Sequence, residues 1–227
     1  MTPRNTKIVA TISNLNCSPD FIKGLYWAGM NVVGLKTAHM THDVALEVIE
    51  NVRTVSDKIG ILLDTKGPEI RTCDNAKPLP VKYGDTIRIK GAPDEISRED
   101  VICVSYEHFV NDIPVGSSIL IDDGYIALAV MEKDDEYLTC YVENDGEINA
   151  RKSINIPSVH VKLPALSEKD KSFIRFAAEN DLDFIAHSFV RNENDVIAVQ
   201  QILDETQSHI KIIAKIENSE GVGNLYE

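Results

Sequence analysis

Apolar positions in the first 71 residues alternate between two spacings. Short apolar runs at residues 7–12, 31–38 and 60–64 are typical of β-strands. Between them, residues 19–28 and 44–56 carry apolar side chains three and four positions apart, as on one face of a helix. Strands that alternate with helices of this length predict right-handed βαβ units and a parallel sheet.

The first helix has clear end signals. Ser18 is a good N-cap residue, Pro19 is tolerated at the first helical position, and Asp20 places a negative charge in the first turn. Gly29 predicts the end of the same helix.

From about Cys73 the helical spacing disappears and short β-type runs follow one another. These runs span residues 86–90, 101–104, 118–121, 126–130 and 137–142. Asp-Gly pairs at residues 123–124 and 145–146 are turn signals. We therefore expect an all-β module at residues 73–158, inserted into an α/β part made of residues 1–72 and 159–227.

The α/β pattern then returns. Ser167 and Asp170 have the spacing of a capping box and predict a helix to about Asn180, and a second helix follows Asn192. Strand-like runs span residues 183–189 and 211–216, and residues 219–227 resemble the start of another helix. About five β/α units result. They suit either an open doubly wound sheet or part of an eight-stranded barrel, and the end at the start of a helix leads us to expect a fragment.

Composition narrows the possible functions. The chain has 227 residues, a net charge of −13 and a pI of about 4.9, so nucleic acid is a poor candidate partner. Its four cysteines have no Cys-x-x-Cys spacing, which argues against a zinc site or a secreted disulfide scaffold. No apolar run reaches 18 residues and no signal-peptide pattern is present, so we expect a cytoplasmic protein without a membrane partner.

Polar residues follow three of the predicted strands, where parallel α/β folds gather functional side chains. Lys215 and Glu217 alternate onto one face of their strand. They could form an ordinary ion pair at a strand end. Alternatively, the lysine stabilises developing negative charge beside a metal-binding carboxylate, which suits phosphoryl transfer or enolate chemistry.

Other charged residues allow two interpretations each. Arg71 could clamp phosphate at the start of the insert, or it could be a solvated loop charge. His39 and His42 make a weak metal pair, so a contact at the strand end is expected for His39 and an exposed position for His42. The turn at residues 122–124 suits a hairpin better than a metal loop.

Several motifs together resemble one known family. They occur at residues 6–12, 28–32, 64–72, 121–124, 163–170, 188–191, 213–218 and 220–221, in one order along nearly the whole chain. In this order they resemble the N-terminal half of pyruvate kinase.

The resemblance implies a fold and an activity. The fold is a partial (β/α)8 barrel with an inserted all-β lid barrel after its third strand. The activity is the glycolytic transfer of a phosphoryl group from phosphoenolpyruvate to ADP, giving pyruvate and ATP. Full-length members form homotetramers, and their second metal carboxylate corresponds to a position beyond Glu227.

The resemblance also implies site residues. Lys215 matches the lysine that stabilises the phosphoryl group in transit, and Glu217 matches a ligand of Mg²⁺ or Mn²⁺. Asp64 and Thr65 match K⁺ ligands, Thr65 through its carbonyl oxygen. Arg71, Lys152 and His39 match residues that contact the nucleotide. Glu69 matches the acid found in potassium-dependent members.

The second strand departs from the family pattern Arg-x-Asn-x-Ser-His. Gly34 replaces the arginine that holds the substrate phosphate, Lys36 replaces a K⁺-binding asparagine, and Ala38 replaces a serine ligand. Ser158 stands where the family has glycine. We hypothesise that the Lys36 ammonium group occupies the K⁺ position and pairs with Asp64.

Two alternatives stay open at this point. A non-catalytic paralogue or remnant could retain the barrel half as a binding or scaffold module, which the three substitutions in the second strand favour. A metal-dependent aldolase or lyase on a similar barrel is disfavoured by the β insert and by residues 64–72.

Overall fold

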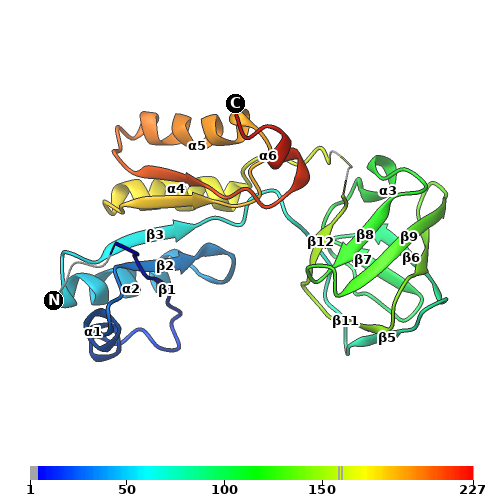
Figure 1. The fold of residues 1–227 in the computed structure, drawn as a ribbon, viewed down its shortest axis with the longest axis horizontal. Coiled ribbons are helices and arrows are strands. Elements are labelled where there is room, and N and C mark those ends of the chain that lie inside the picture. The colour runs from blue at the N-terminus through cyan, green and yellow to red at the C-terminus, as the bar shows by residue number, and fades with distance from the viewer. Residues whose placement is uncertain (1–4, 158, 160, 227) are drawn as a thin grey trace. The chain divides into compact units, whose positions relative to one another are not determined.

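The computed structural model describes residues 5–157, 159 and 161–226, except the side chain of His39. They form two compact units, each described here by itself (Figure 1). The α/β unit comprises Met1–Pro68 and Pro164–Glu227, and the β unit comprises Glu69–Leu163.

The α/β unit is built on one parallel five-stranded sheet. Its strands are β1 (Val9–Thr11), β2 (Val32–Lys36), β3 (Gly60–Asp64), β13 (Phe184–His187) and β14 (Lys211–Ala214). They are paired in the order β1-β2-β3-β13-β14, the order of the chain. A doubly wound sheet reverses its strand order at a switch point, so this sequential order favours a segment of a barrel.

Local sequence signals explain the helices. The helices are α1 (Pro19–Ala28), α2 (His42–Val55), α4 (Glu168–Glu179), α5 (Glu193–Glu205), the short α6 (Ser219–Gly223) and the 3₁₀ turn η1 (Thr37–His39). Ser18 caps α1 by accepting from the N–H of Phe21, and Gly29 ends it with a φ of 111°. Ser167 and Asp170 form the predicted capping box of α4.

One hydrophobic core joins these helices to the sheet. Val33, Leu63 and Ile185 of three neighbouring strands are completely buried, as are Ile49 of α2 and Ile174 of α4. Val9 and Ile213, on the two edge strands, remain exposed. The packed core fixes the strands firmly enough to present the residues that follow them.

The β unit has a sheet that closes on itself. Its strands are β4 (Ile70–Arg71), β5 (Leu79–Val81), β6 (Thr86–Gly91), β7 (Val101–Val104), β8 (Ser118–Ile121), β9 (Ile126–Lys133), β10 (Leu138–Val142), β11 (Gly146–Ile148) and β12 (Ser153–Asn155), and α3 is Phe109–Asp112. The seven-stranded sheet runs β4-β12-β8-β9-β10-β6-β7. Thr72 bridges Val104, so its first and last strands meet as in a barrel.

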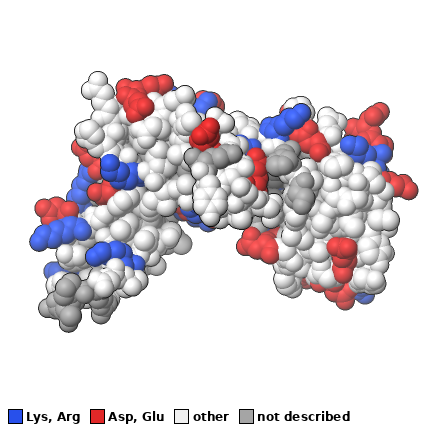
Figure 2. All heavy atoms as spheres, turned by 45° about the horizontal axis from the view of Figure 1, so that its top comes forward, with Lys and Arg blue, Asp and Glu red and all other residues white. Residues whose placement is uncertain are grey.

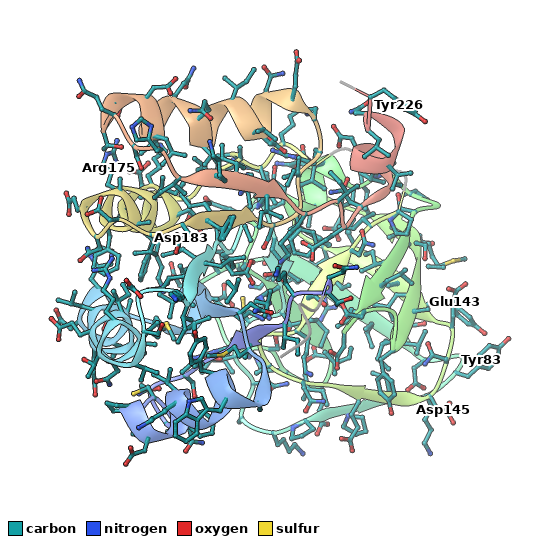
Figure 3. All side chains as sticks on the ribbon, turned by 60° about the vertical axis from the view of Figure 1, so that its left-hand side comes forward. Tyr83, Glu143, Asp145, Arg175, Asp183 and Tyr226 are labelled. Carbon is teal, nitrogen blue, oxygen red and sulfur yellow. The ribbon has the colours of Figure 1, made fainter. Side chains whose placement is uncertain are left out.

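Charges of both signs are interspersed on the surface seen in Figure 2. No helix in the described part of the chain is both long and apolar enough to cross a membrane. Asp183, labelled in Figure 3, precedes β13 and accepts a 2.7 Å hydrogen bond from the N–H of Ile61. This carboxylate holds β3 to β13 at the amino end of the sheet.

Candidate active site at the carboxyl ends of the parallel strands

A cluster of polar side chains lies at the carboxyl end of the sheet. The Lys215 Nζ is 3.1 Å from Oδ1 of Asp64, 2.8 Å from the Ser188 hydroxyl and 3.4 Å from Oε1 of Glu217. The structure therefore brings three of the predicted site residues, Asp64, Lys215 and Glu217, to one ammonium group. Each is partly exposed, so the group is open to a ligand.

Backbone pairing carries these side chains to the same edge. Beyond the end of β3, the N–H of Thr65 donates to Ala186 at 3.0 Å, and beyond β14 the N–H of Lys215 donates to His187 at 2.9 Å. Gly67 then passes so close to Ser188 that a Cβ atom would overlap the carbonyl group of Ser188. A residue without a side chain is needed there, and its φ of +69° also favours glycine.

Ser188 links the cation to the end of β3. Its hydroxyl oxygen is 2.7 Å from the carbonyl oxygen of Thr65 and 3.1 Å from Oδ1 of Asp64. The single hydroxyl proton can go to one of these acceptors while the oxygen accepts from Lys215. Thr37 holds the same strand end by donating its hydroxyl to the Asp64 carbonyl at 3.0 Å.

Glu217 is fixed by a strained turn. Phe189 has a φ of 56°, unusual for a residue with a bulky side chain, and its N–H donates to Oε2 of Glu217 at 3.0 Å. The Asn218 amide holds the turn by donating to the carbonyl oxygens of Phe189 and Val190. Strained residues of this kind cluster at functional sites because the surrounding structure must hold them in place.

His187 supports the cluster from the buried side of the sheet. Its side chain is completely buried, and Nδ1 is 3.0 Å from the Thr65 hydroxyl, which accepts from the N–H of Ser188 at 3.3 Å. Its Nε2 has no hydrogen-bond partner among the described residues. Burial lowers the pKa of His187, and the nearby carboxylates of Asp195 and Asp170 oppose that shift.

The β unit holds a second cationic group, formed by Arg71 of β4 and Lys152 just before β12. Arg71 pairs with Ser153 in the strand register, so the two cations lie on neighbouring strands. Both are already neutralised by carboxylates: Arg71 by Glu69 at 2.7 and 2.8 Å, and Lys152 by Asp122 at 2.9 and 3.1 Å. The two cations predicted to contact the nucleotide are therefore each ion-paired within their own unit.

The predicted pair of Lys36 and Asp64 was wrong. Lys36 is exposed and forms no ion pair among the described residues, although the two residues are partners in the strand register. The Asp64 carboxylate is held instead by Lys215 and Ser188. Lys36 and Asp64 are neighbours in the backbone, but their side chains do not pair, because Lys215 reaches the Asp64 carboxylate from a strand two places away.

Of the other positions that depart from the family pattern or adjoin it, the structure describes the surroundings of Gly34. Gly34 is buried in β2, and an added Cβ atom would lie 3.4 Å from the Thr11 hydroxyl, an ordinary contact. The side chain of His39 lies outside the described part of the structure, as does Ser158.

The cluster fits a magnesium ion better than a potassium ion. Mg²⁺ is commonly held by one or two carboxylates together with substrate phosphates and water, and Glu217 supplies a partly exposed carboxylate of this kind. No three His, Cys, Asp or Glu side chains of the described residues gather into a complete metal site. For K⁺, Lys36 and Ala38 offer no side-chain oxygen, and the Asp64 carboxylate and the Thr65 carbonyl are engaged by Lys215 and Ser188.

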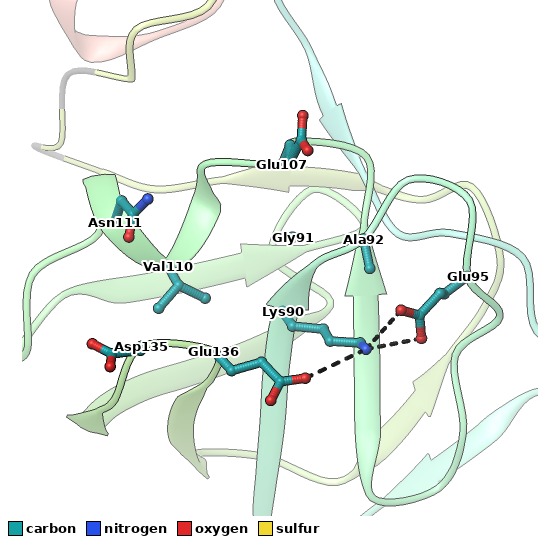
Figure 4. A pocket seen from close by; sticks show the side chains of 9 residues that line it. All are labelled: Lys90, Gly91, Ala92, Glu95, Glu107, Val110, Asn111, Asp135 and Glu136. Carbon is teal, nitrogen blue, oxygen red and sulfur yellow. Dashed lines mark hydrogen bonds and ion pairs between the residues drawn. The ribbon is translucent and has the colours of Figure 1, made fainter.

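Two hollows elsewhere are separate features. One in the β unit, of about 230 Å³, is lined by Lys90 and several acidic side chains, with Lys90 paired to Glu95 and Glu136 (Figure 4). The other, of about 290 Å³, is a mainly apolar groove between α5, β14 and α6. Neither contains a residue of the cluster around Lys215.

Sequence reasoning missed three members of the cluster. Ser188, His187 and Thr37 received no role, although Ser188 stood in a recognised motif. Their contacts reach across 27 to 124 positions in sequence, to Thr65, to Asp64 and to Lys215, and no local pattern reports such pairings. Their position at strand ends was the one available signal.

Comparison with known proteins agrees with the fold. The family model described as "Pyruvate kinase, barrel domain" matches residues 3–227. A protein of Borreliella burgdorferi named pyruvate kinase is 47% identical over 228 residues, covering 100% of this chain and 47% of the relative. Pyruvate kinases of Staphylococcus epidermidis and Staphylococcus aureus are each 41% identical, covering 99% of this chain and 39% of the relative.

The chain thus spans less than half the length of these curated relatives. Its parallel sheet and inserted closed β-sheet are those of a partial (β/α)8 barrel interrupted after the third strand. The chain belongs to the pyruvate kinase family.

Proposed function

We propose that the polypeptide containing this chain transfers a phosphoryl group from phosphoenolpyruvate to ADP in glycolysis, giving pyruvate and ATP. The observation that carries the proposal is the Lys215 ammonium group, held 3.1 Å from Asp64 and 2.8 Å from Ser188, beside Glu217. Phosphoryl transfer needs a fixed cation where negative charge develops, and the three oxygen partners orient this one before substrate arrives.

Each side chain has a proposed role. Lys215 stabilises the charge of the phosphoryl group in transit, and Asp64 and Ser188 hold its ammonium group in position. Glu217 is the carboxylate that would hold Mg²⁺ or Mn²⁺, and the ion would neutralise phosphate charge. His187 keeps Thr65 in place from the buried side.

The β unit, Glu69–Leu163, is proposed to be a lid that binds the nucleotide phosphates through Arg71 and Lys152, and its bounds lie within five residues of the insert at 73–158 expected between barrel segments 1–72 and 159–227. Two cations on neighbouring strands support this assignment. A nucleotide contact for His39 remains a prediction, as do a homotetrameric assembly and a cytoplasmic location.

Monovalent-cation dependence is expected to differ from the family pattern. Asp64 and Thr65 keep their K⁺-ligand positions, but Lys36 and Ala38 offer no oxygen from their side chains. We therefore propose that K⁺ binds weakly at this site. Lys36 then supplies a positive charge nearby without forming an ion pair with Asp64.

A non-catalytic binding module is the second candidate function, favoured by Gly34 in place of the phosphate-binding arginine. Losing one such arginine removes one or two hydrogen bonds worth about 1.5–3 kcal/mol each, and a total loss of about 1.5–4 kcal/mol would lower the rate roughly 10- to 1000-fold. A loss of that size would slow the reaction, but Lys215 and Glu217, which are proposed to act on the phosphoryl group, are still present. The enzyme reading therefore remains the better supported.

One assay separates the two candidates. The natural polypeptide that contains these residues is incubated with phosphoenolpyruvate, ADP and Mg²⁺, and ATP formation is followed by ³¹P NMR. The enzyme forms ATP in step with the loss of phosphoenolpyruvate. Binding of both compounds without ATP formation would support the module instead.

A further inference from the structure

The two cations of the β unit are neutralised in different ways. The Glu69 side chain is only 6% exposed and engages Arg71 through two parallel bonds of 2.7 and 2.8 Å. The Lys152 and Asp122 side chains are 38% and 34% exposed, and a single ammonium group faces both carboxylate oxygens. A bidentate pair with a buried carboxylate is hard to separate, whereas a pair with both side chains about one third exposed is weak and screened by salt.

Asp122 is held beside Lys152 by its backbone. Asp122 and Asp123 both have positive φ, 54° and 55°, in the turn between β8 and β9. The N–H of Asp122 donates to the Ser153 carbonyl at 2.9 Å, and Asp123 and the Ser153 hydroxyl are joined by two further bonds of 3.1 and 3.3 Å. The turn therefore stays on β12 whether or not the ion pair with Lys152 is formed.

This arrangement lets the ammonium group of Lys152 exchange partners without moving the strand. An anion that takes Lys152 has to displace the Asp122 carboxylate, which then returns to water at its exposed position. A singly charged anion gains little from that exchange, since it replaces one negative charge by another. A diphosphate offers more negative charge and several oxygens, so it displaces the carboxylate more readily.

We propose that Asp122 is a displaceable counter-ion that occupies Lys152 until a diphosphate group replaces it, while Glu69 keeps Arg71 fixed. The inference rests on the proposed assignment of Arg71 and Lys152 to nucleotide phosphates, and it adds a residue that sets the affinity of this site for anions. Asp122 competes with the diphosphate for Lys152. Removing the Asp122 charge should therefore strengthen diphosphate binding, even though Asp122 lies in the site.

The test measures binding of inorganic pyrophosphate to the natural polypeptide that contains this chain, by isothermal titration calorimetry. Asp122→Asn should bind pyrophosphate about two- to fivefold more tightly than the unmodified chain, the factor expected for removing a partly exposed ion pair. Asparagine also tolerates positive φ, so the turn should keep its shape. Inorganic phosphate at a pH where it is singly charged has to displace the same carboxylate, so it should gain no more from the substitution than pyrophosphate does.

Asp123→Asn is the matched control. It removes the same charge from the same turn, in a residue with nearly the same φ that pairs with no cation among the described residues, and its amide oxygen can still accept from Ser153. It should leave the dissociation constant within about twofold of the unmodified value. Lys152→Met should remove most of the binding in every background, and melting curves check that each variant folds.

The outcomes separate the inference from the proposed function. Tighter binding by Asp122→Asn alone supports the counter-ion role. Equal or weaker binding by Asp122→Asn, with the unmodified chain binding pyrophosphate, overturns that role and leaves the nucleotide assignment intact. No binding by any of the variants overturns the assignment of Arg71 and Lys152, and the inference with it.

Discussion

The Nζ of Lys215 lies 3.1 Å from Oδ1 of Asp64, although β13 lies between β3, which ends at Asp64, and β14, which Lys215 follows. The lysine side chain reaches across β13, where the Ser188 hydroxyl contacts both groups. The pair thus ties three strand ends together at one point.

Asp64→Asn should impair phosphoryl transfer much more than folding. The pair is partly exposed, so its loss should change the free energy of unfolding by about 1 kcal/mol or less. A misplaced ammonium group should lower the transfer rate by roughly 10²-fold or more. Urea unfolding and the rate of pyruvate formation measure the two effects.

Asp183→Asn is the control for this variant, since Asp183 lies at the opposite end of the same sheet and accepts from Ile61. It should affect stability while leaving the rate per folded molecule nearly unchanged. Equal loss of rate in both variants would show that the Lys215–Asp64 pair has no special role.

Gly67→Ala should distort the cluster. The added Cβ atom would overlap the Ser188 carbonyl group, and the φ of +69° adds strain, so we expect destabilisation of about 1–3 kcal/mol. Gly116→Ala has a similar φ of +87° but meets no atom within 4 Å, so it measures strain alone. If melting temperature and pyruvate formation fell equally in both variants, the close approach to Ser188 would be unimportant.

His187 should make folding sensitive to acid. Burial lowers its pKa, so the unfolded chain binds the proton more readily than the folded chain. The stability that comes from keeping the ring neutral is present above the ordinary histidine pKa of about 6.5 and is lost as the pH falls below it, by up to about 1.4 kcal/mol per pH unit. Urea unfolding at pH 7.5 and 5.5 should therefore show a smaller acid loss for His187→Asn than for the unmodified chain.

Comparison of two amides tests which ring nitrogen of His187 matters. Asparagine can place its amide near the position of Nδ1, which contacts Thr65, whereas glutamine reaches toward Nε2, which has no partner among the described residues. At pH 7.5, His187→Asn should be the more stable variant and the more active. The reverse order would mean that Nε2 makes the important contact.

Elements with local signals could be predicted from the sequence. Ser18, Gly29 and the Ser167–Asp170 box each act within a few residues, and α1 and α4 begin or end where they indicate. Strands β4 and β12, of two and three residues, were missed because they exist only through pairing with each other and with β8.

In the site, too, contacts within one strand could be predicted from the sequence, whereas contacts between strands could not. Alternation along one strand placed Lys215 and Glu217 together, and the structure has them 3.4 Å apart. The contact of Lys215 with Ser188 depends on how β13 and β14 pair, and the partner of Asp64 was wrongly assigned to Lys36 for the same reason. Side-chain reach across a sheet is set by tertiary packing, which strand register alone does not report.

Restoring the two family residues of β2 should raise activity. The Cβ atom of an arginine at position 34 would make only ordinary contacts, so the backbone there accepts Gly34→Arg. Lys36→Asn returns a side-chain oxygen that can bind K⁺. The double variant should form pyruvate roughly 10- to 1000-fold faster and become dependent on K⁺. Gly24→Arg adds the same charge on the exposed surface of α1 and should change nothing.

The most direct measurement is the rate of pyruvate formation from phosphoenolpyruvate and ADP by the natural polypeptide, compared with its Lys215→Met and Lys211→Met variants. Lys211 is an exposed lysine at the other end of β14, so it controls for loss of charge. The account predicts pyruvate formation that falls by about 10²-fold or more in Lys215→Met alone. Absence of pyruvate formation, or equal rates in Lys215→Met and Lys211→Met, would contradict it.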